Sequence, residues 1–330
     1  MKTMQQEDKL PAYYHEKKPN MKRRAYFHDY SSRSIYLVTL VIDGRMPLFG
    51  RVVGNPYKQW GAPEAPHIEL TELGNTIQFQ VYNIKKYYPQ IEILDLQMMP
   101  DHLHVIIDIL GRLPEGLGKL IAGFKTGCNR EYKRLFADLY NSGNRHLFES
   151  DYNDRILYGE EELNNWIHYL RDNPRRLLVK RCFPEFFRVE RDITFAGYKY
   201  SAVGNLFLLR YPDKLQIQCS RNLTLEEIQK YKEDVLKKAR KRAVLVSPRI
   251  SDGEKIAMDA ALDLGYPIIR LEENGFHDFY KPHGRYFDAC SEGRLLLLAP
   301  WQYHTNRVKI RREQCLALNA MAQAICQNAY

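Results

Sequence analysis

The sequence has no long apolar run, no paired cysteines and no excess of acidic residues. Its 330 residues contain no stretch of about 18 consecutive apolar residues, so we expect neither a transmembrane helix nor a membrane partner. The polar, charged N-terminus lacks the apolar core of a signal peptide, and we therefore expect a cytoplasmic protein. Six scattered cysteines form no C-x-x-C pair, which argues against a zinc knuckle and against a disulfide framework.

Basic residues are abundant. The formal net charge is +9, and basic residues exceed acidic ones in both halves of the chain. A protein of this charge suits a polyanionic partner, of which nucleic acid is the usual one, although charge alone is weak evidence. The hydrophobic share of 45% provides core for two ordinary domains.

The first 200 residues predict an α+β domain behind a polar tail at residues 1–25. The expected strands are residues 34–40, 91–98, 102–109 and 147–157, and the expected helices are residues 67–88, 117–136 and 160–180. We expect residues 91–98 and 102–109 to form a hairpin, and Pro174 to end or kink the third helix. This order predicts an antiparallel sheet with helices on a face, a ferredoxin-like domain over residues 26–200.

The remainder of the chain, residues 201–330, has a different pattern. The expected strands are residues 215–219, 243–247, 267–271 and 295–299, and the expected helices are residues 225–242, a segment ending at Gly265, and residues 312–327. Helices that alternate with fully apolar strands predict a parallel sheet, that is, an α/β domain. We place the domain boundary near residues 195–210.

Two histidines interrupt an apolar strand in the stretch M-P-D-H-L-H-V-I-I-D at residues 99–108. Because residues i and i+2 of a strand share a face, His102 and His104 project side by side and can share one divalent ion. Two imidazoles that are simply hydrogen-bonded in a strand are an equal alternative. A histidine-triad hydrolase needs a third histidine where Ile106 stands, and a zinc hydrolase needs a third strong ligand that no H-E-x-x-H motif supplies.

A single-strand DNA transesterase needs, besides the histidine pair, a tyrosine on a helix. The segment W-I-H-Y-L-R-D-N-P at residues 166–174 places Tyr169 and Asn173 four residues apart, on one helix face. Tyr169 can attack phosphorus while Asn173 supplies an oxygen ligand to the ion. Without the histidines, a packed tyrosine and a helix-capping asparagine would be the simpler interpretation.

The chain at residues 26–180 resembles the HUH tyrosine transposases, specifically the REP-associated tyrosine transposases. The stretches that carry this resemblance are I-Y-L-V-T-L at 35–40, R-M-P-L-F-G at 45–50, M-P-D-H-L-H-V-I-I at 99–107, G-K-L-I-A-G-F-K at 118–125, D-R-I-L at 154–157 and Y-L-R-D-N-P at 169–174. The resemblance implies a ferredoxin-like domain that cuts single-stranded DNA with Mg²⁺ or Mn²⁺. It implies His102, His104 and Asn173 as metal ligands and Tyr169 as the nucleophile. Imidazole ligands suit Mn²⁺ better than Mg²⁺.

Several basic side chains are candidates for binding the DNA backbone: Lys125, Arg130, Arg171 and Arg175. Such phosphate contacts give affinity without sequence specificity. Solvated helix surface is an equal interpretation for most of them.

Residues 204–326 bear a fainter resemblance to the DNA-processing protein A superfamily, which implies a Rossmann-like fold. It rests on L-Q-I-Q-C-S-R at 215–221, A-V-L-V-S-P-R-I-S-D-G-E-K at 243–255 and G-R-L-L-L-L-A-P-W at 293–301, while most glycine-rich motifs of that superfamily are missing. A phosphate-binding loop would use Ser220, Arg221, Ser251 and Gly253 at the carboxyl ends of strands. The alternative is an accessory packing or single-strand-binding domain. The basic run at residues 237–242 is most simply a solvated helix end.

Together these patterns predict a metal-dependent, single-stranded DNA endonuclease and strand transferase that forms a 5′-phosphotyrosine intermediate on single-stranded or hairpin DNA. Two other hypotheses remain open: a catalytically idle protein that binds hairpin or single-stranded DNA, and a metal-dependent nucleotide phosphohydrolase. A homodimer is compatible with the sequence, and nothing in it marks an interface.

Overall fold

A computed structural model describes residues 28–240, 243–306 and 309–328. The chain divides into two compact units, and each is described by itself. The first comprises Met1–Gly54 and Pro66–Pro174, and the second comprises Asn55–Ala65 and Arg175–Tyr330. The predicted polar tail lies outside the described residues. The division into domains at residue 200 stays a prediction, whereas the compact units divide after Pro174.

The first unit contains a four-stranded sheet in the order β4-β5-β1-β6, with every neighbouring pair antiparallel. Its strands are β1 (Ser34–Val41), β4 (Ile91–Met99), β5 (His102–Ile109) and β6 (Asn153–Leu157). The predicted hairpin is confirmed, because Met99 pairs with His102 across the turn at Pro100 and Asp101.

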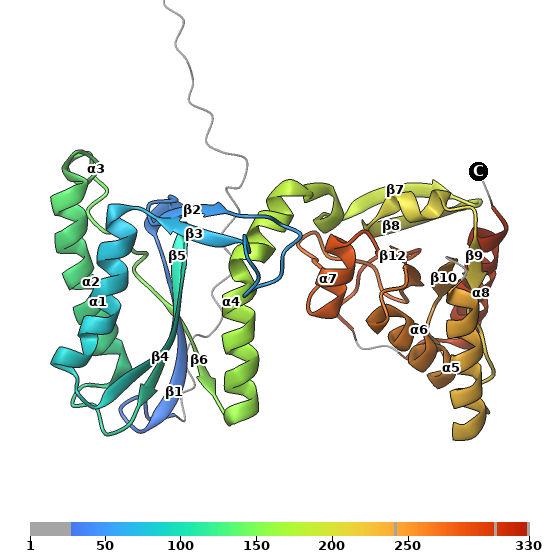
Figure 1. The fold of residues 1–330 in the computed structure, drawn as a ribbon, viewed down its shortest axis with the longest axis horizontal. Helices are drawn as coiled ribbons and strands as arrows, with labels where there is room; N and C mark the ends of the chain where they lie inside the picture. Colours follow the sequence, from blue (N-terminus) through green and yellow to red (C-terminus); the bar gives the residue numbers. More distant parts are fainter. Residues whose placement is uncertain (1–27, 241–242, 307–308, 329–330) are drawn as a thin grey trace, which may run out of the picture. The chain divides into compact units, whose positions relative to one another are not determined.

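The two faces of this sheet are covered by different helices (Figure 1). On one face Tyr36, Val38 and Leu40 are buried under α1 (Glu72–Tyr87) and α2 (Gly116–Leu135). The alternate residues of the same strand point to the opposite face, where Leu37 packs with Ile106 and with Leu170 of α4 (Glu160–Cys182). The part of α4 up to Pro174 therefore covers the face to which His102 and His104 belong.

Some predicted bounds are wrong. The strand expected at residues 147–157 forms only over β6, Asn153–Leu157. The expected helix at residues 67–88 begins only at Glu72, and His67–Leu70 is instead strand β3, paired antiparallel with β2 (Gly50–Val53). The side chain of Thr71 accepts a hydrogen bond from the backbone N–H of Gly74 and so begins α1. The strand was missed because it is only four residues long and runs almost directly into α1. Short elements complete this unit: η1 (Asp43–Arg45) and α3 (Ala137–Asn141).

The second unit contains a six-stranded sheet in the order β7-β8-β12-β11-β10-β9. Strands β9 (Lys214–Gln216), β10 (Val244–Ser247), β11 (Ile268–Leu271) and β12 (Leu295–Ala299) are parallel, as predicted. The antiparallel strands β7 (Glu190–Phe195) and β8 (Tyr198–Gly204) were not predicted. Because β8 pairs with β12, both belong to this unit.

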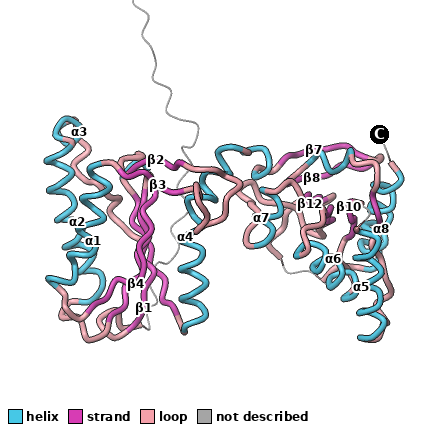
Figure 2. Tube along the Cα trace, viewed as in Figure 1, coloured by secondary structure: helices cyan, strands magenta, loops and turns pink. Residues whose placement is uncertain are grey.

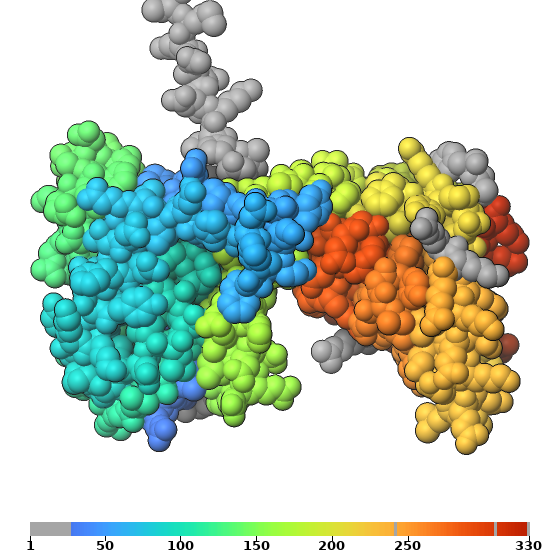
Figure 3. Space-filling view, viewed as in Figure 1, coloured from blue at the N-terminus to red at the C-terminus, as the bar shows by residue number. Residues whose placement is uncertain are grey.

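Helices cover both faces of the second sheet (Figure 2). Helices α5 (Leu225–Ala239), α6 (Asp252–Asp263) and α7 (Arg285–Ser291) pack on the face that buries Leu245 and Ile268. Helix α8 (Arg312–Gln327) packs on the other, against Val246 and Ile269. The short helices η2 (Pro184–Phe187) and η3 (Leu206–Arg210) complete the unit, and α5 and α6 adjoin on its surface (Figure 3).

In the described part of the chain, no helix is long and apolar enough to cross a membrane. The last two residues of the predicted helix at residues 225–242 lie outside the described residues.

Candidate functional site: a histidine pair in the first unit

His102 and His104 lie on one face of β5, and every ring nitrogen has a partner. Nδ1 of His102 lies 2.6 Å from Oδ1 of Asp101, and Nδ1 of His104 lies 2.8 Å from Oγ1 of Thr39. The two Nε2 atoms are 3.2 Å apart. Asp101 and Thr39 thus hold the two Nδ1 atoms, and the two Nε2 atoms face each other.

The separation of the Nε2 atoms fits two ligands of one metal ion. Nitrogens bound at about 2.0–2.1 Å, with an angle of about 90–110° at the ion, lie about 2.8–3.4 Å apart. The hydrogen bonds on Nδ1 are of the kind that orients metal-binding imidazoles. Among the described residues no group of three His, Cys, Asp or Glu side chains could hold a metal. Within this part of the chain, the predicted third ligand is therefore an amide, that of Asn173.

Burial favours a neutral His104. Burial, and after it the neighbouring His102, lowers the pKa of His104 from 6.5 to about 3. Burial alone would raise the pKa of Asp101, but the hydrogen bond from His102 and that from Arg45, at 3.0 Å, hold it below its ordinary value. A neutral imidazole with a carboxylate on its neighbour is the state that binds a cation.

Helix α4, which carries the predicted nucleophile, packs on the same face of the sheet. Leu170 is buried against Leu37 and Ile106, and Asn173, less than one turn later, is only 9% exposed. Tyr169 is 44% exposed, and its ring lies edge-on to Trp166 with centroids 5.3 Å apart. Neither histidine hydrogen-bonds to Tyr169 or Asn173. The roles of these two residues at the metal stay predictions.

Pro174 lies inside α4 rather than at its end. Its ring nitrogen carries no hydrogen, so the carbonyl of Leu170 loses its usual helical donor directly beside Asn173. The helix nevertheless continues to Cys182.

The side chain of Lys125 has a structural task. Its ammonium group donates to the backbone carbonyls of Glu149, Asp151 and Ser150 at 2.7, 2.9 and 3.2 Å. Burial lowers its pKa. These bonds hold the loop that leads into β6, and this structural role is an alternative to DNA binding by Lys125. The role in DNA binding stays a prediction.

The three predicted DNA-binding arginines differ in exposure. Arg130 is exposed, and Nε of Arg171 pairs with Asp95 at 3.1 Å. Arg175, in the second unit, is 4% exposed, pairs with Asp288 and lies over the ring of Phe287. A buried, paired guanidinium makes Arg175 the poorest of the candidates for contact with a phosphate.

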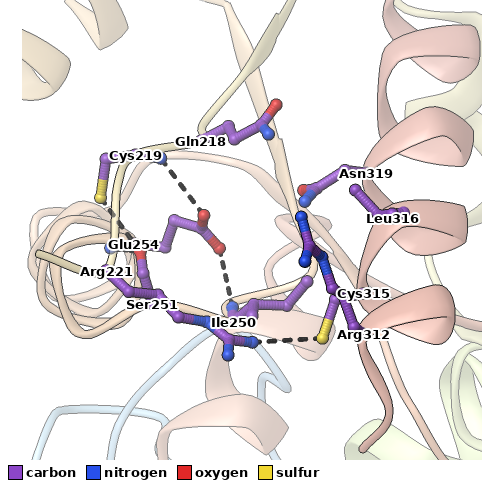
Figure 4. Close-up of a pocket in the computed structure, with 10 residues that line it drawn as sticks. All are labelled: Gln218, Cys219, Arg221, Ile250, Ser251, Glu254, Arg312, Cys315, Leu316 and Asn319. Atoms are coloured by element: carbon purple, nitrogen blue, oxygen red, sulfur yellow. Dashed lines mark hydrogen bonds between the residues drawn. The ribbon is translucent and has the colours of Figure 1, made fainter.

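The predicted phosphate loop borders a cavity of about 340 Å³ in the second unit (Figure 4). Here Glu254, only 2% exposed, accepts hydrogen bonds from the backbone N–H of Ile250 at 2.7 Å and of Cys219 at 3.2 Å. Its carboxylate also accepts from the hydroxyl of Ser247 at 3.4 Å. Two backbone donors beside the predicted loop are therefore satisfied by the protein's own carboxylate.

The four residues predicted for this loop have contacts within the protein. Ser251 caps α6 by accepting from the N–H of Glu254, Ser220 accepts from the N–H of Asn222, and Arg221 donates to Sγ of Cys315 at 3.2 Å. A Cβ on Gly253 would lie 2.6 Å from Sγ of Cys219, so packing explains this glycine. Phosphate binding at these residues stays a prediction.

Sequence reasoning missed Asp101, Thr39 and Glu254. The pattern S-D-G-E at residues 251–254 is a capping-box motif and carried a signal for Glu254. Nothing local marked Thr39, because only the pairing of β1 with β5 brings it to His104.

Comparison with known proteins gives distant likenesses. No family model matches the chain. An uncharacterized protein of Haemophilus influenzae is 22% identical over 167 residues, which span 44% of this chain and 83% of that protein.

Solved structures give matches of low TM-score. A REP-associated tyrosine transposase bound to a REP hairpin has a TM-score of 0.29 and 14% identity, covering 46% of this chain and 72% of that one. A protein described as a transposase from Deinococcus radiodurans has a TM-score of 0.28 and 15% identity, covering 47% and 98%. DNA processing protein A from Helicobacter pylori has a TM-score of 0.32 and 22% identity, covering 43% and 67%. With TM-scores this low, these likenesses carry no argument about activity.

Proposed function

We propose that the first unit is a metal-dependent, single-stranded DNA endonuclease and strand transferase of the HUH tyrosine class. The observation that carries the proposal is the pair of inward-facing Nε2 atoms, 3.2 Å apart, on the sheet face covered by the helix of Tyr169. The order β4-β5-β1-β6, with α1 and α2 on one face, supports a ferredoxin-like fold. The parallel strands β9 to β12 support a Rossmann-like second domain.

In the proposed reaction the phenolic oxygen of Tyr169 attacks a DNA phosphorus. A bond forms between that oxygen and phosphorus while the bond to the 3′ oxygen breaks; the phenol loses its proton and the 3′ oxygen gains one. The products are a 5′-phosphotyrosine and a free 3′-hydroxyl, so the strand can be rejoined without ATP. A bound Mg²⁺ or Mn²⁺ would polarise a phosphoryl oxygen.

Several side chains have defined tasks in this scheme. His102 and His104 would hold the ion, and Asn173 would offer its amide oxygen from the buried side of α4. Tyr169 is exposed enough to reach a strand in solvent, and its ring is positioned by Trp166. Exposed bases such as Arg130 would contact phosphates and confer a salt-dependent affinity.

The test is a covalent adduct on a denaturing gel, with 5′- and 3′-labelled hairpin oligonucleotides and Mn²⁺. We expect adduct and cleavage from the wild type and neither from Tyr169→Phe, which keeps the ring and its packing. Tyr158→Phe is the matched control, because Tyr158 is exposed and lies just before α4. An adduct of normal yield from Tyr169→Phe would refute the assignment. Binding without any adduct from the wild type would favour an idle DNA-binding protein.

A further inference from the structure

Four side chains form a continuous hydrogen-bonded row across the histidine pair. The row runs from Asp101 to His102, then to His104 and to Thr39, with contacts of 2.6, 3.2 and 2.8 Å. Thr39 on β1 is the direct cross-strand partner of His104 on β5. Each contact needs exactly one hydrogen, so the positions of the hydrogens along the row depend on one another.

When both imidazoles are neutral, the carboxylate of Asp101 determines which atom carries the hydrogen in each contact of the row. Asp101 accepts only, so Nδ1 of His102 carries a hydrogen and its Nε2 carries a lone pair. The hydrogen between the two rings must then belong to Nε2 of His104. Nδ1 of His104 is left with a lone pair, and the hydroxyl of Thr39 must donate to it.

A metal ion held by both rings requires the opposite arrangement at His104. Both Nε2 atoms must then offer lone pairs, so the hydrogen of His104 must be on Nδ1. The hydroxyl of Thr39 must turn from donor to acceptor. His104 loses a proton at Nε2 and gains one at Nδ1, and its net charge does not change.

We infer that Thr39 is a positioning residue that lets His104 change tautomer when an ion binds, an inference that rests on the metal-dependent function proposed above. A hydroxyl both donates and accepts, which suits the two arrangements. Valine has almost the same shape and strand preference but neither capacity. All other residues from Ile35 to Ile42 are apolar or aromatic, so packing alone does not call for a hydroxyl at position 39.

The experiment compares the full-length wild type with Thr39→Val and with the matched control Thr39→Ser, which keeps the hydroxyl. Binding of Mn²⁺ is measured by titration calorimetry. We expect Thr39→Val to bind Mn²⁺ about 10–100-fold more weakly, as is typical when a partner of a metal ligand is lost. Thr39→Ser should bind with nearly wild-type affinity. Unchanged thermal melting of Thr39→Val shows that the fold is intact.

A second measurement reports the tautomer directly. Long-range ¹H–¹⁵N spectra of ¹⁵N-histidine-labelled protein, with diamagnetic Zn²⁺ as the probe, distinguish the two nitrogens of each ring. The signals of His104 among the 10 histidines are assigned by substituting it. We expect hydrogen on Nε2 without the ion and on Nδ1 with it.

The outcomes separate the inference from the proposed function. If the wild type binds Mn²⁺ or Zn²⁺ while Thr39→Val binds equally well, or His104 keeps one tautomer throughout, the role of Thr39 is refuted and the metal site stands. If the wild type binds neither ion, the metal-dependent function and the role of Thr39 both fail.

Discussion

Replacing Glu254 by glutamine tests whether a buried carboxylate occupies the position of an anion in the second unit. In Glu254→Gln the amide oxygen can still accept from Ile250, but the NH₂ group takes the place of the oxygen that accepts from Cys219. Two N–H donors then face each other in a buried site. The substitution preserves volume, so the effect comes from hydrogen bonding and charge.

The expected cost follows from the hydrogen bonds of the carboxylate. A hydrogen bond to a charged group contributes about 1.5–3 kcal/mol, and a neutral one about 1 kcal/mol. The bond from Cys219 is lost and the bond from Ile250 becomes neutral, while the contact with Ser247, at 3.4 Å, is too long to count for much. The second unit should therefore be destabilised by about 2–4 kcal/mol.

The assay is hydrogen-exchange mass spectrometry on peptides that cover Cys219 and Ile250, because a local probe separates the two units of the chain. Glu227→Gln is the matched control: Glu227 occupies the same position in the exposed capping box of α5, and its loss should have little effect. Equal protection of wild type and Glu254→Gln would refute the reasoning. So would inorganic phosphate that slows exchange at these two amides in the wild type, since it would show that the donors are free for a ligand.

Two further predictions concern the first unit. Unfolded His104 takes up a proton near pH 6.5, whereas folded His104 does so only near pH 3. The free energy of unfolding should therefore fall as the pH is lowered from 6.5 toward 3. In His104→Gln the melting temperature should decline less steeply over the same pH range. Lys125→Met should speed amide exchange in the loop at residues 149–152, because three carbonyls lose their common donor, while Lys119→Met, which removes an exposed lysine of the same helix, should not. A decline as steep in His104→Gln as in the wild type, or an unchanged loop in Lys125→Met, would contradict the respective argument.

Local patterns predicted the hairpin of β4 and β5 because Pro100 and Asp101 separate two apolar strands. The β7–β8 hairpin was not predicted because neither of its strands is a continuous apolar run. Its turn requires positive φ at Ala196, a residue that rarely marks such a turn, as well as at Gly197. The histidine pair was predictable because the strand repeat alone sets its geometry.

The partners of the histidines depend on tertiary pairing. Asp101 lies beside His102 in the sequence, yet its role appears only once the turn directs its carboxylate to Nδ1. Thr39 reaches His104 through the register of β1 on β5, which no local pattern of residues 35–40 encodes. The same holds for Glu254, whose capping-box motif predicts a bond to its own helix end but not the bond from Cys219.

The chain crosses between the two compact units more than once, because Asn55–Ala65 belongs to the second unit although it lies between β2 and β3 of the first. Within the second unit, Tyr57 of this insertion contacts Phe183, with ring centroids 5.8 Å apart. A fragment that ends at Pro174 would therefore contain the eleven residues Asn55–Ala65 of the second unit. The remaining chain would lack those residues, so the second unit would be incomplete. Exchanging one unit for that of another protein therefore requires two chain segments to be moved together.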